Sequence, residues 1–266
     1  MTRALFLGAG ASPGVPSLSC GFGCCDPTNP KNIRTRTSTV YEINGKRLLI
    51  DASPDLRAQF LHNDIKNLDG IMITHAHFDH IGGIDELREI NRINKKPLNV
   101  YAPNYVMKTL KKRYAYMVMD KRSKKEYMKD GYEAKGGIII NIIKPNHEFN
   151  IQDIKITPLK LLGHNVPSCG YIINDEIVHL GDFKELSSSA EERIAGIKPK
   201  LMVFPLTILD EHRYHLGLKE VLYYVDKFKP EHIVLNHMAS ECDYVYVNNH
   251  TPANVEPAFD NLELKW

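Results

Sequence analysis

The sequence has no long hydrophobic run. None of its apolar stretches approaches the ~20 residues that a membrane-spanning helix needs. It also lacks a dominant charge, because 34 Lys and Arg residues face 32 Asp and Glu residues. Net charge alone therefore indicates neither a nucleic acid nor a membrane surface as partner. Residues 1–8 are too short, and too soon interrupted by glycine, for a secretory signal peptide. We expect a cytoplasmic protein that does not contact the membrane.

Cysteine is scarce, and its number is odd. Five cysteines do not complete a disulfide framework, which favours a reducing compartment. Cys20, Cys24 and Cys25 lie together in a glycine-rich stretch. Three clustered thiols would suit a structural zinc site, but such a site needs a fourth ligand at the right place. Small residues in a tight loop are the more common explanation, so we favour that interpretation and keep the zinc site as the alternative.

Short apolar runs separated by turn residues dominate the rest of the chain, and its hydrophobic content of 43% is that of a globular protein. The runs predict strands at 4–8, 38–43, 47–51, 70–74, 98–102, 137–143, 148–150, 154–162, 171–173, 177–180, 201–204 and 232–235. Helices are predicted from a Ser53 cap to residue 63, at 84–93, from about 103, at 188–195 and at 218–228. Strand-rich halves that each end in helices predict an α+β fold, a four-layer αββα sandwich, with residues 1–266 as a single domain.

One stretch lacks a clear period and is rich in basic residues, and we predict a basic insertion at about 105–136. Residues 108–135 hold ten Lys and Arg residues against four Asp and Glu residues, with four tyrosines interleaved. A charged, solvated lid is the more common meaning of such a composition. The same residues would also suit an RNA backbone with stacked bases.

The motif Thr74-His75-Ala76-His77-Phe78-Asp79-His80 carries the strongest chemical signal. It places three imidazoles and a carboxylate directly after the apolar run 68–73. Further polar residues follow later strands or open a helix, where a rigid scaffold presents its chemistry: His164, Asp182, His215 and His237. Imidazole and carboxylate are the ligands that zinc and manganese accept. The pattern therefore predicts a hydrolase that uses a metal-bound water.

The motif resembles the HxHxDH signature of the metallo-β-lactamase superfamily, and His164, Asp182 and His237 follow in the order that this superfamily uses. The resemblance implies the metallo-β-lactamase fold and two divalent metal ions, zinc or manganese. It implies that His75, His77 and His164 bind one ion, and that Asp79, His80 and His237 bind the other. It also implies that Asp182 bridges the two ions.

Finer motifs resemble the phosphodiesterase branch, which includes the 5-phosphoribosyl 1,2-cyclic phosphodiesterase, the tRNA 3′-processing endonucleases and the pyrroloquinoline quinone biosynthesis protein B. They are LGAGASPGVP at 7–16, Cys25-Asp26-Pro27, Pro30-Lys31-Asn32, Arg34, Arg36, Ser38, His215-Leu216-Gly217-Leu218 and Val234-Leu235-Asn236-His237-Met238. The cyclic phosphodiesterase has a structural zinc held by three loop cysteines and a histidine, and Ser240 stands at that histidine's position here. This difference argues against a structural zinc site in the cysteine loop and against a narrow assignment of the substrate.

We predict a dinuclear metal-dependent phosphodiesterase that acts on a small cyclic phosphodiester or nucleotide-like substrate. Two metal ions about 3.5–4 Å apart would hold a bridging hydroxide for in-line attack. Asp79 would bind metal and orient the water, and His215 would bind a phosphoryl oxygen or protonate the leaving alkoxide. Arg34 and Arg36 are candidate phosphate contacts, and His212 is a rival to His215.

Other functions fit the same metal ligands. The first alternative is an RNA-processing endonuclease of the same superfamily. A β-lactamase or thioesterase remains open, because a metal set does not determine the scissile bond. A metal-binding cofactor-biosynthesis protein without turnover is the non-enzymatic alternative. A homodimer is also compatible with the sequence.

Overall fold

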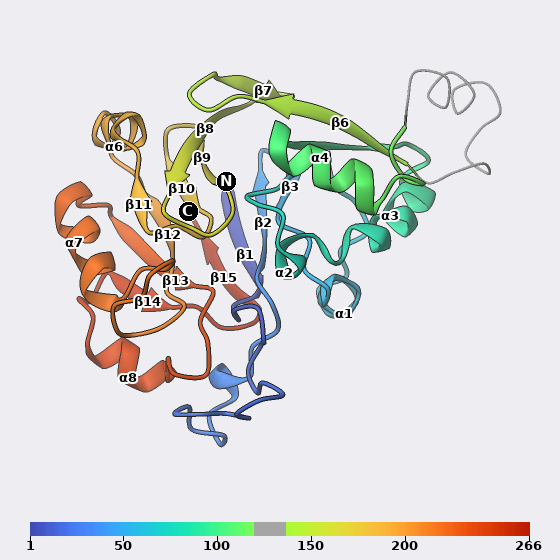
Figure 1. Ribbon diagram of the computed structural model, residues 1–266. Coiled ribbons are helices and arrows are strands. Elements are labelled where there is room, and N and C mark those ends of the chain that lie inside the picture. The colour runs from blue at the N-terminus through green and yellow to red at the C-terminus, as the bar shows by residue number, and fades with distance from the viewer. Residues whose placement is uncertain (120–136) are drawn as a thin grey trace.

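The computed structural model describes residues 1–119 and 137–266, which form two β sheets packed face to face (Figure 1). The first sheet has seven strands in the order β15-β1-β2-β3-β4-β5-β6. These strands are β1 (Thr2–Gly8), β2 (Ser38–Ile43), β3 (Lys46–Ile50), β4 (Gly70–Met72), β5 (Leu98–Pro103), β6 (Ile138–Ile143) and β15 (Leu262–Lys265).

The second sheet has eight strands, with β11-β8-β9-β10-β12-β13-β14 in order and β7 paired to β8 off this path. They are β7 (Phe149–Ile151), β8 (Ile154–Leu162), β9 (Ser168–Ile173), β10 (Ile177–Leu180), β11 (Glu185–Leu186), β12 (Leu201–Pro205), β13 (His232–Asn236) and β14 (Val255–Pro257). Strands β10, β12 and β13 run parallel, so their carboxyl ends lie at one edge of the sheet.

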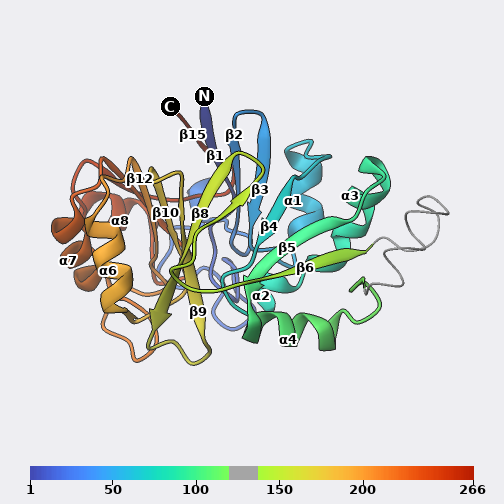
Figure 2. The ribbon, with the colours of Figure 1, turned by 90° about the horizontal axis from the view of Figure 1, so that it is seen from above.

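Helices cover the outer face of each sheet (Figures 1 and 2). Beside the first sheet lie α1 (Leu56–His62), α3 (Leu87–Asn94) and α4 (Asn104–Arg113), and beside the second lie α6 (Ser188–Ala195), α7 (Leu218–Phe228) and α8 (Tyr244–Asn249). Short turns of helix are η1 (Pro30–Asn32), α2 (Phe78–Ile81) and η2 (Ile84–Glu86). This arrangement confirms the predicted four-layer αββα sandwich.

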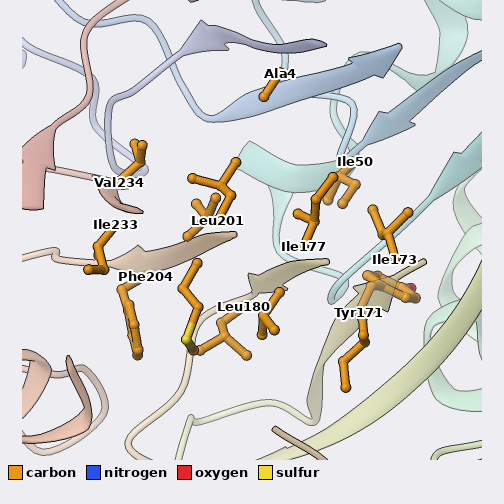
Figure 3. Close-up of a cluster of buried hydrophobic side chains, with 14 of the residues drawn as sticks. Ala4, Ile50, Tyr171, Ile173, Ile177, Leu180, Leu201, Phe204, Ile233 and Val234 are labelled. Atoms are coloured by element: carbon orange, nitrogen blue, oxygen red, sulfur yellow. The ribbon is translucent and has the colours of Figure 1, made fainter. Parts of the chain in front are cut away.

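The layers follow from the alternation of side chains along each strand. In β1, Ala4 and Phe6 belong to the core that joins the two sheets, whereas Leu5 and Leu7 belong to the core beneath the helices. Figure 3 shows Ala4 of the first sheet in the buried cluster that holds Leu201 of the second. A strand with both faces buried is apolar throughout, and burying each such side chain contributes roughly 1.5–3 kcal/mol.

The element boundaries differ from the prediction in a few places. Ser53 does not cap α1; the N-cap is Asp55, and the Ser53 hydroxyl accepts from the Asp55 N–H at 3.2 Å while donating to Gln59 at 3.1 Å. Six short elements were not predicted: η1, α2, α8, β11, β14 and β15. Of these, β15 pairs antiparallel with β1 and brings the two ends of the chain together. Each is six residues or fewer, too short for a periodic signal.

The predicted basic insertion is only partly described. Its first residues form α4, whose Val106, Met107 and Leu110 are buried against the first sheet. Met117 is also buried. The described first part of the predicted insertion is therefore packed against the first sheet. Residues 120–136 lie outside the described residues, so a basic lid there stays a prediction. Among the described residues, no helix is long and apolar enough to cross a membrane.

Candidate metal centre

Strand ends from both sheets bring the predicted ligands together. His75 and His77 follow β4, and Asp79 and His80 lie in α2 directly afterwards. From the second sheet, three residues follow strands that run in the same direction: His164 after β8, Asp182 after β10 and His237 after β13. The carboxyl ends of these strands share one edge, and for that reason residues separated by up to 162 positions in the sequence meet.

The seven candidate ligands include two groups whose members coincide with those implied by the resemblance. The first group is His75, His77 and His164, and the second is Asp79, His80 and His237; in each, the possible ligand atoms lie within 4.8 Å of one another. Two further groups of possible ligands overlap them: His75, His80 and Asp182, and His164, Asp182 and His215. In the first group, His77 Nδ1 lies 3.0 Å from His75 Nε2 and 3.3 Å from His164 Nε2. In the second, Asp79 Oδ2 lies 3.2 Å from His237 Nε2 and 3.3 Å from His80 Nε2.

Asp182 lies between the two groups. Its Oδ2 is 4.0 Å from His75 Nε2 in the first group, and 3.4 Å from His237 Nε2 and 4.0 Å from His80 Nε2 in the second. One carboxylate oxygen therefore faces both groups, as a bridging ligand must. The same atom lies 3.8 Å from His215 Nδ1, which places His215 at the rim of the cluster.

Burial and charge suit this cluster to cations. Burial lowers the pKa of His75, His77 and His164, so these rings are neutral and offer lone pairs. Burial alone would raise the pKa of Asp79, but the neighbouring His80 and His237 outweigh it and lower that pKa. The groups that lower the pKa of Asp79 and Asp182 are histidines of the same cluster. Buried carboxylates are costly unless positive charge compensates them, and a bound cation would supply it.

Asp51 orients His80 and was missed in the sequence. Its Oδ2 lies 2.6 Å from His80 Nδ1, on the side of the ring opposite the cluster, and accepts the Thr74 hydroxyl at 2.7 Å. Its Oδ1 accepts the Thr74 N–H at 2.8 Å. Asp51 adopts φ +59°, a left-handed conformation that Asp tolerates better than most residues. It directly follows β3, so the strand-end reasoning that found Asp182 could have found it.

Replacing Asp51 by Asn should weaken the second group of ligands. The amide keeps the shape of the side chain but removes the charge that holds His80 Nδ1–H, so Nε2 becomes a poorer ligand. We expect the zinc dissociation constant of this group to rise by about 10- to 100-fold in a competition titration with a chromogenic chelator. Asp69→Asn is the matched control, because Asp69 accepts from the Arg47 N–H and from Gln152 away from the cluster. Equal zinc affinity in the two variants would exclude this role.

Thr207 and the Tyr214 carbonyl position the remaining rings and were also missed. The Tyr214 oxygen lies 3.2 Å from His164 Nδ1. Thr207 Oγ1 lies 3.0 Å from His237 Nδ1 and 3.1 Å from His215 Nδ1. Since His237 Nε2 faces the cluster, its proton belongs on Nδ1 and is donated to Thr207. The Thr207 hydroxyl then donates to His215 Nδ1, and the proton of the neutral His215 ring lies on Nε2.

Gly181 allows Asp182 to approach β4. A Cβ at this position would lie 2.6 Å from Thr74 Cβ and 2.7 Å from the Cys169 carbonyl oxygen. Both neighbours are held in the sheets, since the Cys169 N–H donates to the Thr74 oxygen at 3.0 Å. The segments that carry Thr74 and Asp182 are thus in close contact next to the cluster.

Gly181→Ala should therefore lower the free energy of unfolding by about 1–3 kcal/mol, the usual effect of overpacking a rigid interior. Urea denaturation followed by circular dichroism measures it. Gly196→Ala is the control: a Cβ there would meet its nearest neighbour at an ordinary 3.4 Å, and we expect a change within about 1 kcal/mol. An equally small change in both variants would show that the structure relieves the crowding at Gly181 without loss of stability.

Arg34 requires a correction as a phosphate contact. Its side chain is only 1% exposed, and its guanidinium donates to the carbonyl oxygens of Lys31, Ala239 and Cys242 and to Asn32 Oδ1. A buried guanidinium that uses its donors in this way secures the loop and does not reach a substrate. Arg36 is more exposed and pairs with Asp55 at 3.0 Å, so its assignment to phosphate stays a prediction.

The cysteine loop contacts Ser240, the position that the sequence comparison singled out. Cys20 Sγ lies 3.1 Å from Ser240 Oγ, and the Cys25 thiol donates to the Ser240 carbonyl oxygen at 3.4 Å. No group of three or more possible metal ligands among the described residues includes a cysteine. The loop is thus held against Ser240 by hydrogen bonds, and both interpretations of the three cysteines stay predictions.

Comparison with known proteins agrees with the fold and the cluster. A family model described as "Beta-lactamase superfamily domain" matches residues 46–238. A protein named octanoyltransferase from Porphyromonas gingivalis is 30% identical over 263 residues, which are 98% of this chain but 51% of that protein. The chain thus spans about half the length of this relative.

Two solved structures share the architecture over nearly their whole length. One is described as a new diphosphatase from the PhnP family, with a TM-score of 0.87 and 24% identity over 100% of this chain and 98% of the other. The second is Zn²⁺-bound PqqB from Methylobacterium extorquens, with a TM-score of 0.76 and 17% identity over 99% and 100% of the two chains. At these identities the likeness shows the metallo-β-lactamase fold. Since the family model spans all seven clustered ligands, the chain belongs to the metallo-β-lactamase superfamily of hydrolases.

Proposed function

We propose that this protein is a dinuclear metal-dependent phosphodiesterase acting on a small nucleotide-like phosphodiester. The observation that carries the proposal is the position of Asp182 Oδ2, which faces both groups of ligands and also lies 3.8 Å from His215. Two bound zinc or manganese ions would supply a nucleophile from water at neutral pH and positive charge for the phosphoryl oxygens. The donor set of five imidazoles and two carboxylates fits such ions.

His215 is the group that favours a phosphoryl substrate. Its side chain is 18% exposed at the rim, and burial lowers its pKa to about 4, so the ring is neutral at pH 7. With Nδ1 bonded to Thr207, the ring offers Nε2–H as a donor. A fixed neutral donor suits a phosphoryl oxygen, whose negative charge grows as the ester bond breaks. Asp79 would hold a metal ion together with His80 and His237 and orient the attacking water.

Two of the similar structures support the proposal. The protein with the TM-score of 0.87 is described as a diphosphatase, which acts on a phosphorus–oxygen bond, and the PqqB structure contains zinc. The relative named octanoyltransferase favours a second candidate function, the hydrolysis of an octanoyl thioester, because the same metal chemistry can attack a thioester carbonyl.

Turnover of two model substrates tests these proposals. Protein loaded with zinc or manganese should hydrolyse bis-p-nitrophenyl phosphate faster than octanoyl coenzyme A. The reverse preference would favour the thioesterase. No turnover of either substrate, in protein shown by mass spectrometry to hold two ions, would contradict both and favour a binding role in cofactor biosynthesis. A salt-sensitive RNA gel shift with cleavage would promote the endonuclease.

A further inference from the structure

Phe78 is an exposed aromatic side chain inside the ligand motif. It lies between His77 and Asp79 and is 60% exposed, while Asp79 and His80 on the following positions of α2 are buried in the cluster. Other large apolar side chains are exposed in the described residues, but Phe78 is the one among them that adjoins predicted metal ligands. Single exposed apolar residues are common, so position rather than exposure makes this one informative.

The Phe78 ring is seated against Gly82, one turn later. A Cβ on Gly82 would lie 2.9 Å from Phe78 Cε2 and 3.0 Å from Cζ, so the ring occupies the space that a side chain would take. The backbone of this turn is closed by a hydrogen bond from the Gly82 N–H to the Phe78 oxygen, at 2.6 Å. One side of the ring is therefore supported by the backbone, and the remainder is open.

We propose that Phe78 is a stacking platform for the planar ring of the substrate, and that the substrate is a nucleotide carrying its phosphoryl group into the metal cluster. This proposal rests on the phosphodiesterase function proposed above and names its substrate class. A seated, exposed ring loses little conformational entropy when a base stacks on it. Its neighbours in the chain, His77 and Asp79, belong to the cluster, so a base stacked on Phe78 would lie near a phosphoryl group bound there.

Equilibrium binding tests this inference without depending on turnover. Isothermal titration calorimetry of the zinc-loaded protein would compare AMP with ribose 5-phosphate, which has the phosphate but no base. The wild-type protein should bind AMP more tightly. Phe78→Ala should weaken AMP binding by about 5- to 150-fold, the range for loss of one base–aromatic stack, and leave ribose 5-phosphate within about twofold.

Three further variants separate stacking from other roles. Phe78→Leu keeps an apolar side chain without a π-face and should behave like Phe78→Ala, whereas Phe78→Trp should keep the AMP preference. Tyr223→Ala is the matched control, because Tyr223 is 61% exposed on α7 and should leave both affinities unchanged. Zinc content and melting temperature are measured for every variant.

The inference is overturned if the wild-type protein shows no preference for AMP, or if Phe78→Ala weakens both ligands equally. Failure of the phosphodiesterase proposal appears separately, as absent hydrolysis of bis-p-nitrophenyl phosphate in protein that still prefers AMP. The two proposals are therefore judged by different measurements.

Discussion

Asp79→Ala is expected to lower kcat/KM for bis-p-nitrophenyl phosphate by at least ~10³-fold and to release metal at the same time. The carboxylate contacts both His80 and His237, at 3.3 and 3.2 Å, and is 3% exposed, so its loss removes one ligand and loosens two others. Losing a ligand should exceed the 10- to 100-fold effect typical of a residue that only orients one. Stopped-assay kinetics and metal analysis by mass spectrometry on the same preparation measure the two losses.

Asp226→Ala provides the comparison for Asp79→Ala. Asp226 is an exposed carboxylate on α7, and we expect its removal to leave rate and metal content unchanged. If Asp79→Ala kept two ions and wild-type activity, the assignment of Asp79 to the second group would be wrong. Full metal content with a large rate loss would instead restrict Asp79 to orienting the attacking water.

His215→Ala is expected to reduce kcat by about 10²- to 10³-fold while the protein keeps both metal ions. The ring lies at the rim of the cluster, Thr207 fixes its tautomer, and its Nε2–H is available for a phosphoryl oxygen. Removal of one fixed donor to a developing oxyanion typically has an effect of this size. Because the pKa of His215 is lowered to about 4, the rate should not fall between pH 6 and 8 through titration of this ring.

His212→Ala separates the two rival histidines. The His212 ring lies 5.4 Å from the His215 ring but is exposed, and its Nδ1 accepts the Tyr214 N–H at 3.2 Å. We expect a rate within a few-fold of wild type. A larger loss of kcat in His212→Ala than in His215→Ala would assign the phosphoryl contact to His212 instead. Loss of metal in His215→Ala would show that His215 is an eighth metal ligand.

The predicted strands were largely confirmed, and the physical reason is local. β2, β8 and β10 have the predicted bounds because segments rich in β-branched and apolar residues, ended by turn residues, leave few alternatives. The Asn44-Gly45 turn between β2 and β3 has φ values of +51° and +74°, which few other residue pairs adopt. β15 was missed because four residues with one buried side chain carry almost no pattern.

The candidate metal ligands show where a sequence is informative and where it is not. The residue types and their order are properties of the sequence. They were enough to predict His75, Asp182 and five further residues as metal ligands, because few folds place histidine and aspartate at the ends of so many strands. The roles of Arg34 and Asp51 are tertiary properties. In the sequence, Arg34 is a plausible phosphate contact, but in the structure its guanidinium donates to buried carbonyl groups. Asp51 is an ordinary residue after a strand in the sequence, but in the structure its carboxylate lies 2.6 Å from His80 Nδ1.

The amino-acid sequence alone thus specified the four layers, the family resemblance and the ligand types, since each depends on residue kind and short-range spacing. The packing of the two sheets decided the rest. Gly181 lets β4 and Asp182 meet, so one carboxylate oxygen faces both ligand groups, and Thr207 orders the protons of two rings separated by 22 residues in the chain. These contacts join distant segments, and no periodicity within a single segment encodes them.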